Sequence, residues 1–290
     1  MKSYHDIPGD GGSRILEQVA GQQARIDTAL AGVKHLLAVG SGKGGVGKST
    51  LTLQLASVLA ARGSEVAVLD ADFNGPTQAR LAGVQAAVPL PGAAAMALPR
   101  SRAGFGVFSM GSLVPETRAV EFDSLSHGSS YTWRATREFT LLGEILGSVA
   151  WGRLDILLLD LPPGTERIVQ FAEFLGPRTR FVLVSIPSRL ARGVVLRSAA
   201  ALSGAGRPAI GYIENMDGYA CGGCDEVRPL FPTSDEGLPG LPCLGRVPFD
   251  PELATLCDLG QPITDHPDLP SARALSGVAG RLLEILEVTS

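Results

Sequence analysis

The sequence predicts an α/β fold with a doubly wound, mostly parallel sheet and helices on both faces. Short apolar runs alternate with stretches of helical spacing along most of the 290 residues. The runs LLAVG, VAVLD, ILLLD and FVLVS are almost continuously apolar, as is typical of parallel strands that are buried on both faces. A glycine-rich segment directly follows the first run and precedes a helical stretch. Such sheets bind ligands at the carboxyl ends of their strands.

The predicted elements follow one another from the N-terminus. Residues 1–13 are Gly-rich and polar and are predicted to be a disordered tail, whereas residues 14–290 are predicted to form a single domain. Apolar residues at helical spacing predict the helices, the first of which is amphipathic. The predicted helices are Arg14–Leu30, Lys48–Arg62, Glu138–Val149, Ile168–Phe174, Arg192–Ser203 and Ala272–Leu286. The predicted strands are His35–Gly40, Glu65–Asp70, Gly106–Met110, Asp155–Asp160, Arg180–Ile186, Ala209–Glu214 and Leu241–Val247.

Three long connections interrupt this alternation. Residues 85–104 are rich in Ala, Pro and Gly, and residues 111–137 are polar with little periodicity. Residues 217–240 contain a close pair of cysteines. Long connections of this kind are often functional lids or contact loops.

Composition narrows the class of protein. Hydrophobic residues make up 45% and charged residues 19%, as in ordinary globular proteins. The net charge of −4 does not favour nucleic acid as a partner. No apolar run approaches the ~20 residues of a membrane span, and the first residues do not resemble a signal peptide. We therefore expect a cytoplasmic protein without membrane insertion, and its four cysteines fit a reducing compartment.

A phosphate-binding loop is predicted between the first strand and the second helix. The segment matches G-x-x-x-x-G-K-[ST] and consists of Gly42, Lys43, Gly44, Gly45, Val46, Gly47, Lys48 and Ser49. Its backbone N–H groups and the helix N-terminus suit phosphate, Lys48 suits the β/γ-phosphates and the Ser49 hydroxyl suits Mg²⁺. The pattern, with Thr50 as a further contact, predicts binding of ATP and Mg²⁺ and slow hydrolysis of the ATP. The alternative is a glycine-rich turn without a ligand.

Carboxylates follow two of the predicted strands. Asp70 and Asp72 end the second strand, and Asp160 ends ILLLD in the manner of a Walker B strand. A carboxylate at this position can hold Mg²⁺, and Gly164 can donate a backbone N–H near the γ-phosphate. Ser49, Asp72 and Asp160 are therefore the predicted Mg²⁺ residues. Aspartates at strand ends also serve as helix caps or turn formers, which is the alternative interpretation.

Several motifs in this order resemble one known family. SGKGGVGKST, LDADFNGPT, DLPPGT and IENM, followed by C-x-x-C, are similar to the Mrp/ApbC (Nbp-like) iron–sulfur carrier ATPases of the MinD/ParA/nitrogenase-iron-protein class. The likeness extends from about Gly32 to Ile263. It implies that Lys43 acts in trans across a homodimer, although a solvated loop lysine is the alternative. It also implies that Asp72 orients the attacking water.

The resemblance further implies a site for the base. In the family, the asparagine that corresponds to Asn215 binds the adenine. The segment Gly245–Asp250, which includes Pro248, matches the segment that closes over the base.

Cys221 and Cys224 are spaced C-x-x-C, with glycines that permit a tight turn. Two thiolates in one chain are half of the set that a [4Fe–4S] cluster takes. The resemblance implies a cluster bridged by both cysteines of two subunits, delivered to apo client proteins or exchanged with a cluster scaffold. The alternatives are zinc, a redox disulfide, an inert pair, or a ParA/MinD-like switch ATPase that uses the pair for dimer contact. Cys243 and Cys257 are isolated, and Cys243 is expected to be packed.

The sequence departs from the family at three places, which indicates a divergent member. Glu166-Arg167 follow DLPPGT where the family has Gly-Asp. The family's Trp-Arg-Gly-Pro appears as residues 133–136, WRAT, and its Gln-Asp pair is replaced within residues 187–190, PSRL. These places lie in the family's switch or dimer-facing regions, so the departures bear on hydrolysis rate and partner choice.

Overall fold

The computed structural model describes residues 15–73, 75–84, 98–112, 131–222, 226–231 and 237–288. The chain divides into two compact units. The first comprises residues 1–32, 89–97 and 122–152, and the second comprises residues 33–88, 98–121 and 153–290. The predicted disordered tail, residues 1–13, lies outside the described residues. A single domain over residues 14–290 stays a prediction.

The second unit is built on an eight-stranded sheet, which confirms the predicted α/β fold class. Its strands are β1 (Val33–Gly40), β2 (Val66–Asp70), β3 (Gly106–Phe108), β4 (Leu154–Asp160), β5 (Thr179–Ser185), β6 (Gly211–Ala220), β7 (Val227–Arg228) and β8 (Cys243–Phe249). The order is β3-β2-β4-β1-β5-β6, with β8 parallel and β7 antiparallel to β6. β1 therefore lies between β4 and β5, where both of its faces are covered, and this explains its apolar run.

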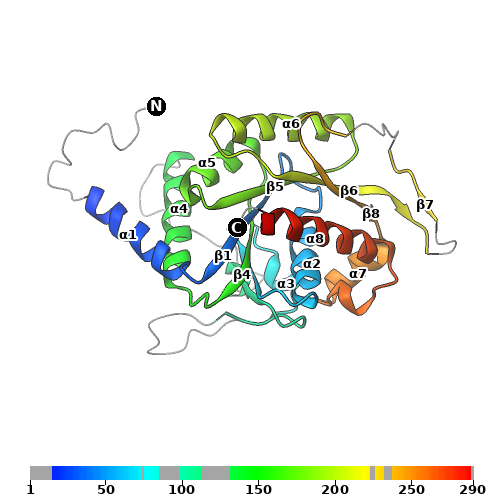
Figure 1. Cartoon of the computed structure of the whole chain (residues 1–290), viewed down its shortest axis with the longest axis horizontal. Helices are drawn as coiled ribbons and strands as arrows, with labels where there is room; N and C mark the ends of the chain where they lie inside the picture. Colours follow the sequence, from blue (N-terminus) through cyan, green and yellow to red (C-terminus); the bar gives the residue numbers. More distant parts are fainter. Residues whose placement is uncertain are drawn as a thin grey trace. The chain divides into compact units, whose positions relative to one another are not determined.

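Helices cover both faces of this sheet (Figure 1). They are α2 (Lys48–Ala61), α3 (Gln78–Leu81), α5 (Thr165–Leu175), α6 (Arg189–Gly204), α7 (Pro251–Asp258) and α8 (Pro270–Val288), with the 3₁₀ turns η2 (Met110–Ser112) and η3 (Ile263–Asp265). α5 and α6 lie on one face, and α2 and α8 on the other (Figure 1). α2 is packed between the sheet and α8, so Leu51, Leu55 and Leu59 are all almost fully buried. This closely packed core fixes the position of α2, at whose N-terminus the P-loop ends.

The first unit contains α1 (Ile15–Ala29) and α4 (Tyr131–Ser148). Ile26 of α1 is buried, as are Leu142 and Leu146 of α4, and the two helices are in contact. α1 agrees with the predicted leading helix. The prediction of a loop over 111–137 is wrong for 131–137, because α4 begins at Tyr131. Residues 113–130 lie outside the described residues.

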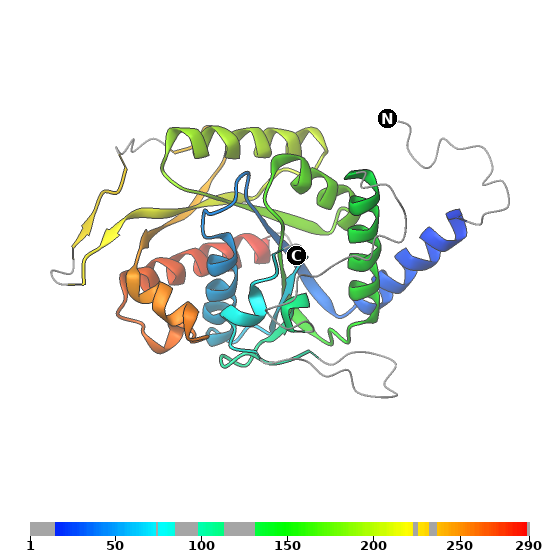
Figure 2. The same ribbon diagram turned by 180° about the vertical axis from the view of Figure 1, so that it is seen from behind.

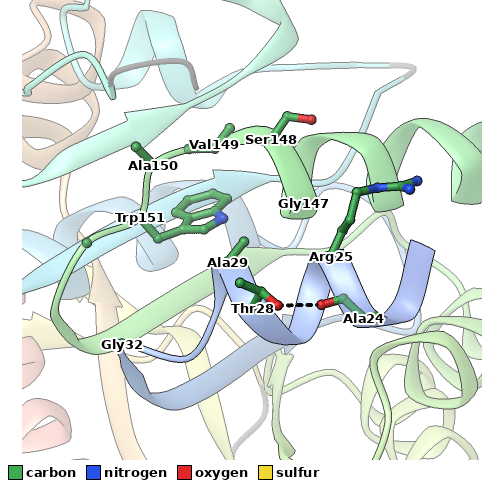
Figure 3. Close-up of a pocket in the computed structure, with 11 residues that line it drawn as sticks. Ala24, Arg25, Thr28, Ala29, Gly32, Gly147, Ser148, Val149, Ala150 and Trp151 are labelled. Atoms are coloured by element: carbon green, nitrogen blue, oxygen red, sulfur yellow. Dashed lines mark hydrogen bonds between the residues drawn. The ribbon is translucent and has the colours of Figure 1, made fainter. Parts of the chain in front are cut away.

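An open hollow of about 600 Å³ lies within the first unit (Figure 3). It is formed by the C-terminal part of α1 and residues 147–152. The Trp151 indole is buried and donates to the Leu146 carbonyl at 3.0 Å, and the Thr28 hydroxyl donates to the Ala24 carbonyl at 2.8 Å. The hollow contains none of the residues predicted to bind nucleotide or metal.

The loop predicted over 217–240 is wrong in its first part. β6 continues to Ala220 and pairs with β7, so that the two strands form a ribbon at the end of the sheet (Figure 2). Within this part of β6, Met216 has a φ of 57° and Gly218 a φ of 94°, so the strand continues to Ala220 with an irregular backbone. α3 and α7 were not predicted, because each is too short to show helical periodicity. Residues 85–97 of another predicted loop lie outside the described residues, and Arg100 forms a bridge with Gly106.

No helix in the described part of the chain combines the length and the apolar character that crossing a membrane requires.

Candidate functional site

The predicted P-loop connects β1 to α2 and leaves the N-terminus of α2 open. Gly47 is the N-cap residue at φ 80° and ψ 19°, a left-handed conformation that glycine adopts without strain, and no side chain caps the helix there. The first N–H groups of α2 therefore have no side-chain acceptor in competition with a ligand. Gly42 packs against α6 so closely that a Cβ would lie 2.2 Å from the Val194 Cγ1 atom. This glycine-lined helix N-terminus is suited to phosphate.

Lys48 and Asp160 form a buried ion pair beneath the loop. The Lys48 Nζ atom lies 2.5 Å from the Asp160 Oδ1 atom, and the two side chains are 7% and 0% exposed. The Lys48 Nζ atom is also 3.4 Å from the Ser49 Oγ atom, and the Thr52 hydroxyl lies 3.4 Å from the same carboxylate oxygen. The structure thus brings together three residues predicted for phosphate and Mg²⁺, namely Lys48, Ser49 and Asp160.

Asp70 and Asp160 lie opposite each other on the neighbouring strands β2 and β4. Asp70 is 1% exposed, and its carboxylate accepts hydrogen bonds from the backbone of Thr77 and Gln78 and from the Ser109 hydroxyl. Burial, followed by the charge of Asp160, raises the pKa of Asp70 to about 7, although the hydrogen bonds from Gln78, Ser109 and Asp72 act in the opposite direction. Through these hydrogen bonds, Asp70 holds the backbone of the segment that follows β2 in place.

Asp72, by contrast, is half-buried just beyond the end of β2, where its backbone N–H donates to Asp70. Its carboxylate is the more accessible member of the predicted Asp70–Asp72 pair. The role of Asp72 in orienting water and holding Mg²⁺ stays a prediction.

Two further loop residues have defined positions. Gly164 precedes α5 at φ 121°, and its N–H donates to the Ser41 carbonyl at 2.8 Å. It therefore lies against the residue that directly precedes the P-loop, and its contact with the γ-phosphate stays a prediction. Lys43 and Thr50 are half-buried on the loop and at the start of α2.

Asn215 on β6 lies directly against the P-loop. Its Nδ2 atom donates to the Val46 carbonyl at 2.9 Å, and a Cβ on Gly47 would lie 2.2 Å from that nitrogen. In the register of β6 and β8, Asn215 is opposite Val247, which precedes the buried Pro248. The structure thus brings Asn215 against the P-loop and places Pro248 next to its strand partner, and the binding of the base there stays a prediction.

Cys221 directly follows β6 and lies opposite the residue that precedes β7. Ala220 pairs with Val227, and the Cys221 N–H donates to the Glu226 carbonyl at 3.0 Å. Cys221 is half-buried, and Gly222 is exposed. Cys224 lies outside the described residues, so the geometry of the cysteine pair stays a prediction.

The other two cysteines differ in burial. Cys257 on α7 is buried, and its sulfur accepts from Gln54. Cys243 begins β8 and is only half-buried, so the expectation that it is packed holds in part. Among the described residues, no group of three or more His, Cys, Asp and Glu side chains could hold a metal ion.

Sequence reasoning missed residues that join the motifs. Gln78 contacts both Ser49 and Asp160, and Thr52 supports the same carboxylate. Neither belongs to a spacing pattern, so only the fold reveals them.

At the departures from the family pattern, Arg167 lies over the Phe171 ring at 5.4 Å, and Ser188 caps α6 by accepting from the Ala191 N–H. The side chains of residues 133–136 lie outside the described part.

The strand order, the open helix N-terminus and the lysine–carboxylate pair beneath it define a P-loop NTPase. The family model described as ParA: NUBPL iron-transfer P-loop NTPase matches residues 32–283. The chain belongs to this family of iron–sulfur cluster carrier and assembly NTPases, as its motifs predicted.

Named relatives agree with this assignment. The iron-sulfur cluster carrier protein of Saccharolobus solfataricus is 29% identical, over 94% of this chain and 91% of its own length. The cytosolic Fe-S cluster assembly factor NUBP2 of Bos taurus is 35% identical, over 88% of this chain and 94% of its own. Among solved structures, a nucleotide-binding protein from Archaeoglobus fulgidus in complex with ADP is 31% identical, with a TM-score of 0.68, and the match covers 84% of this chain and 94% of that one.

Proposed function

We propose that this chain is an ATP-dependent iron–sulfur cluster carrier that acts as a homodimer in the cytosol. Two copies hold one [4Fe–4S] cluster between their Cys221 and Cys224 thiolates, and ATP binding and slow hydrolysis control its release to apo client proteins or its exchange with a scaffold. The observation that carries the proposal is the course of β6. This one strand contacts the P-loop through Asn215 and ends at Ala220, directly before Cys221.

On the nucleotide side, Lys48 has a clear task. Its Nζ atom is held by Asp160, so an ATP phosphate competes with that carboxylate for the same ammonium group. When Lys48 turns to the phosphate, one oxygen of Asp160 loses its cationic partner. The open N-terminus of α2 receives the phosphate charge, and Asn215, with Pro248 beside its strand partner, borders the base.

The donor set fits Mg²⁺. This ion prefers hard oxygen ligands and usually keeps several waters. The hydroxyl of Ser49 and the carboxylates of Asp72 and Asp160 are such oxygens at one edge of the sheet, and Lys48 links the first to the last. Mg²⁺ bound there would neutralise charge on the ATP phosphates. Asp72, which is half-buried where Asp70 is buried, is the carboxylate that we propose orients the attacking water.

On the cargo side, the C-x-x-C motif that follows β6 suits a cluster shared between two subunits. One chain offers two thiolates of the C-x-x-C turn, and four complete the usual set of a [4Fe–4S] cluster, so a second copy is required. Thiolates of a client would replace those of Cys221 and Cys224 when the cluster leaves. Lys43 acts in trans on the partner's nucleotide, which ties hydrolysis to the dimer.

Anaerobic reconstitution with iron and sulfide tests the cargo. We expect four irons per dimer and a broad visible absorption in the wild type, both lost in the Cys221→Ala/Cys224→Ala variant. A Cys243→Ala variant is the matched control, because Cys243 is half-buried but lies outside the motif, and it should retain the cluster. Stoichiometric zinc without a cluster in the wild type would show that the proposal is wrong.

A further inference from the structure

Gln78 lies at the meeting point of three parts of the nucleotide site. It is the first residue of α3, and it is fully buried. Its Nε2 atom donates to the Ser49 carbonyl at 3.0 Å and to the Asp160 Oδ2 atom at 2.8 Å. Its backbone N–H donates to Asp70 at 3.0 Å. The residue therefore joins the segment after β2 to the P-loop and to the end of β4.

The orientation of the Gln78 carboxamide follows from these partners. Both neighbours of Nε2 are acceptors, and a flipped amide would place Oε1 against two oxygens. The oxygen is therefore the atom that lacks a partner, and it is buried without a hydrogen-bond donor in the structure. An unsatisfied buried acceptor lowers stability, so this oxygen, on a carboxamide whose nitrogen contacts Ser49 and Asp160, calls for a ligand that donates.

We infer that Gln78 is a positioning residue of the Mg²⁺ site whose carboxamide oxygen accepts a hydrogen bond from a water held by the ion. This inference rests on the proposed binding of Mg²⁺ and nucleotide. Mg²⁺ dehydrates reluctantly and keeps several waters, each of which is a strong donor. The Oε1 atom of Gln78 is the acceptor for such a water, while its Nε2 atom holds the Asp160 carboxylate in place by a hydrogen bond.

The local charge explains why a neutral side chain suits this position. Asp160 already lies opposite Asp70, whose raised pKa reflects burial and the neighbouring negative charge. A third carboxylate at position 78 would add repulsion to this pair, whereas a carboxamide provides an acceptor without charge. Through the backbone bond to Asp70, the same residue links Mg²⁺ binding to the position of the segment that carries Asp72.

The test compares nucleotide affinity with and without the metal. ADP is titrated calorimetrically into the full-length protein, once in EDTA and once with Mg²⁺, for wild type, Gln78→Met and Gln78→Asn. Gln78→Met preserves the side-chain volume but removes both polar atoms. Gln78→Asn keeps the carboxamide but, being one methylene shorter, moves it away from its partners. We expect affinities within about twofold of wild type in EDTA. With Mg²⁺ we expect the affinity to fall about tenfold, and the Mg²⁺ concentration that gives half of the enhancement to rise by a similar factor, as for one lost hydrogen bond to a charged group.

Gln54→Met is the matched control. Gln54 is also fully buried, but both ends of its carboxamide are satisfied, by the Gln261 carbonyl and the Ile263 N–H, and neither partner belongs to the nucleotide site. This variant should melt at a lower temperature and keep the wild-type Mg²⁺ enhancement. An unchanged enhancement in the Gln78 variants, or an equal loss with and without Mg²⁺, overturns the inference. Absence of Mg²⁺-dependent ADP binding in the wild type instead contradicts the proposed function.

Discussion

The buried pair of Lys48 and Asp160 makes a quantitative prediction, because the two charges serve both stability and binding. Lys48→Met removes the cation and leaves the Asp160 carboxylate buried at 0% exposure. Loss of one partner from a buried ion pair typically destabilises a protein by about 3–5 kcal/mol. Asp160 keeps the Gln78 Nε2 donor at 2.8 Å, so we expect the lower end, about 3 kcal/mol.

A second substitution separates stability from binding. Asp160→Asn in the Lys48→Met background removes the buried carboxylate charge that has lost its partner. The new asparagine amide can still accept from Gln78 and approach the Thr52 hydroxyl. We expect the double variant to recover about 2 kcal/mol, so that the double-mutant cycle shows coupling of that size. Neither variant should bind ADP, because the cation for the phosphates is missing from both.

The assay is urea and thermal unfolding of the metal-free protein, together with ADP titration. A loss of about 3 kcal/mol corresponds to a fall of roughly 6–12 °C in melting temperature for a domain of this size. Lys34→Met is the matched control, because Lys34 and Asp155 are also 2.5 Å apart but are 71% and 32% exposed. That substitution should cost less than about 1 kcal/mol. Two results would refute this reasoning about the cost of a buried, unpaired carboxylate. One is a Lys48→Met variant as stable as Lys34→Met, and the other is a double variant no more stable than Lys48→Met.

Two other substitutions test the loop. Gly47→Ala should lower ADP affinity and reduce stability by more than about 1 kcal/mol, since its Cβ would lie 2.2 Å from the Asn215 Nδ2 atom in addition to the strain at φ 80°. Gly63→Ala is its control in unfolding measurements, since φ is 91° but nothing lies within 4 Å of the added Cβ. Lys43→Ala should retain ADP binding but lose ATP hydrolysis that depends on protein concentration. Hydrolysis at the wild-type rate would refute the role of Lys43 in trans.

The central strands could be predicted from the sequence because burial on both faces produces an unbroken apolar run. β1, β2, β4 and β5 all lie within a few residues of the predicted ranges. The second half of β6 could not be predicted, because Asp217 and Gly218 are residues typical of turns. There the pairing with β7 and β8 outweighs local propensity, at the expense of an unusual φ of 57° at Met216.

The candidate site divides in a similar way. The P-loop and the strand-end aspartates follow from motif spacing, because phosphate binding constrains residues that are adjacent in the chain. The strand order β2-β4-β1 brings Asp160 into contact with Lys48 and buries Asp70 in the interior. Local sequence patterns do not encode this order. Gln78 is a lone glutamine in a helix of four residues, so no periodicity distinguishes it.

β6 provides the covalent connection between the two halves of the proposed function. Glu214, just before Asn215, is 1% exposed and is held by Arg192 at 3.0 Å and by Arg246 at 3.5 Å, so the strand is anchored at this point. Beyond it the pairing with β8 becomes irregular between Asn215 and Tyr219, before the cysteine turn begins. The same ladder also shifts register between Tyr212 and Ile213, so the ion-paired Glu214 lies between two irregular stretches of the β6–β8 pairing. In the proposed carrier, a change at Asn215 on nucleotide binding would therefore reach Cys221 along β6 itself, through the stretch where the pairing with β8 is irregular.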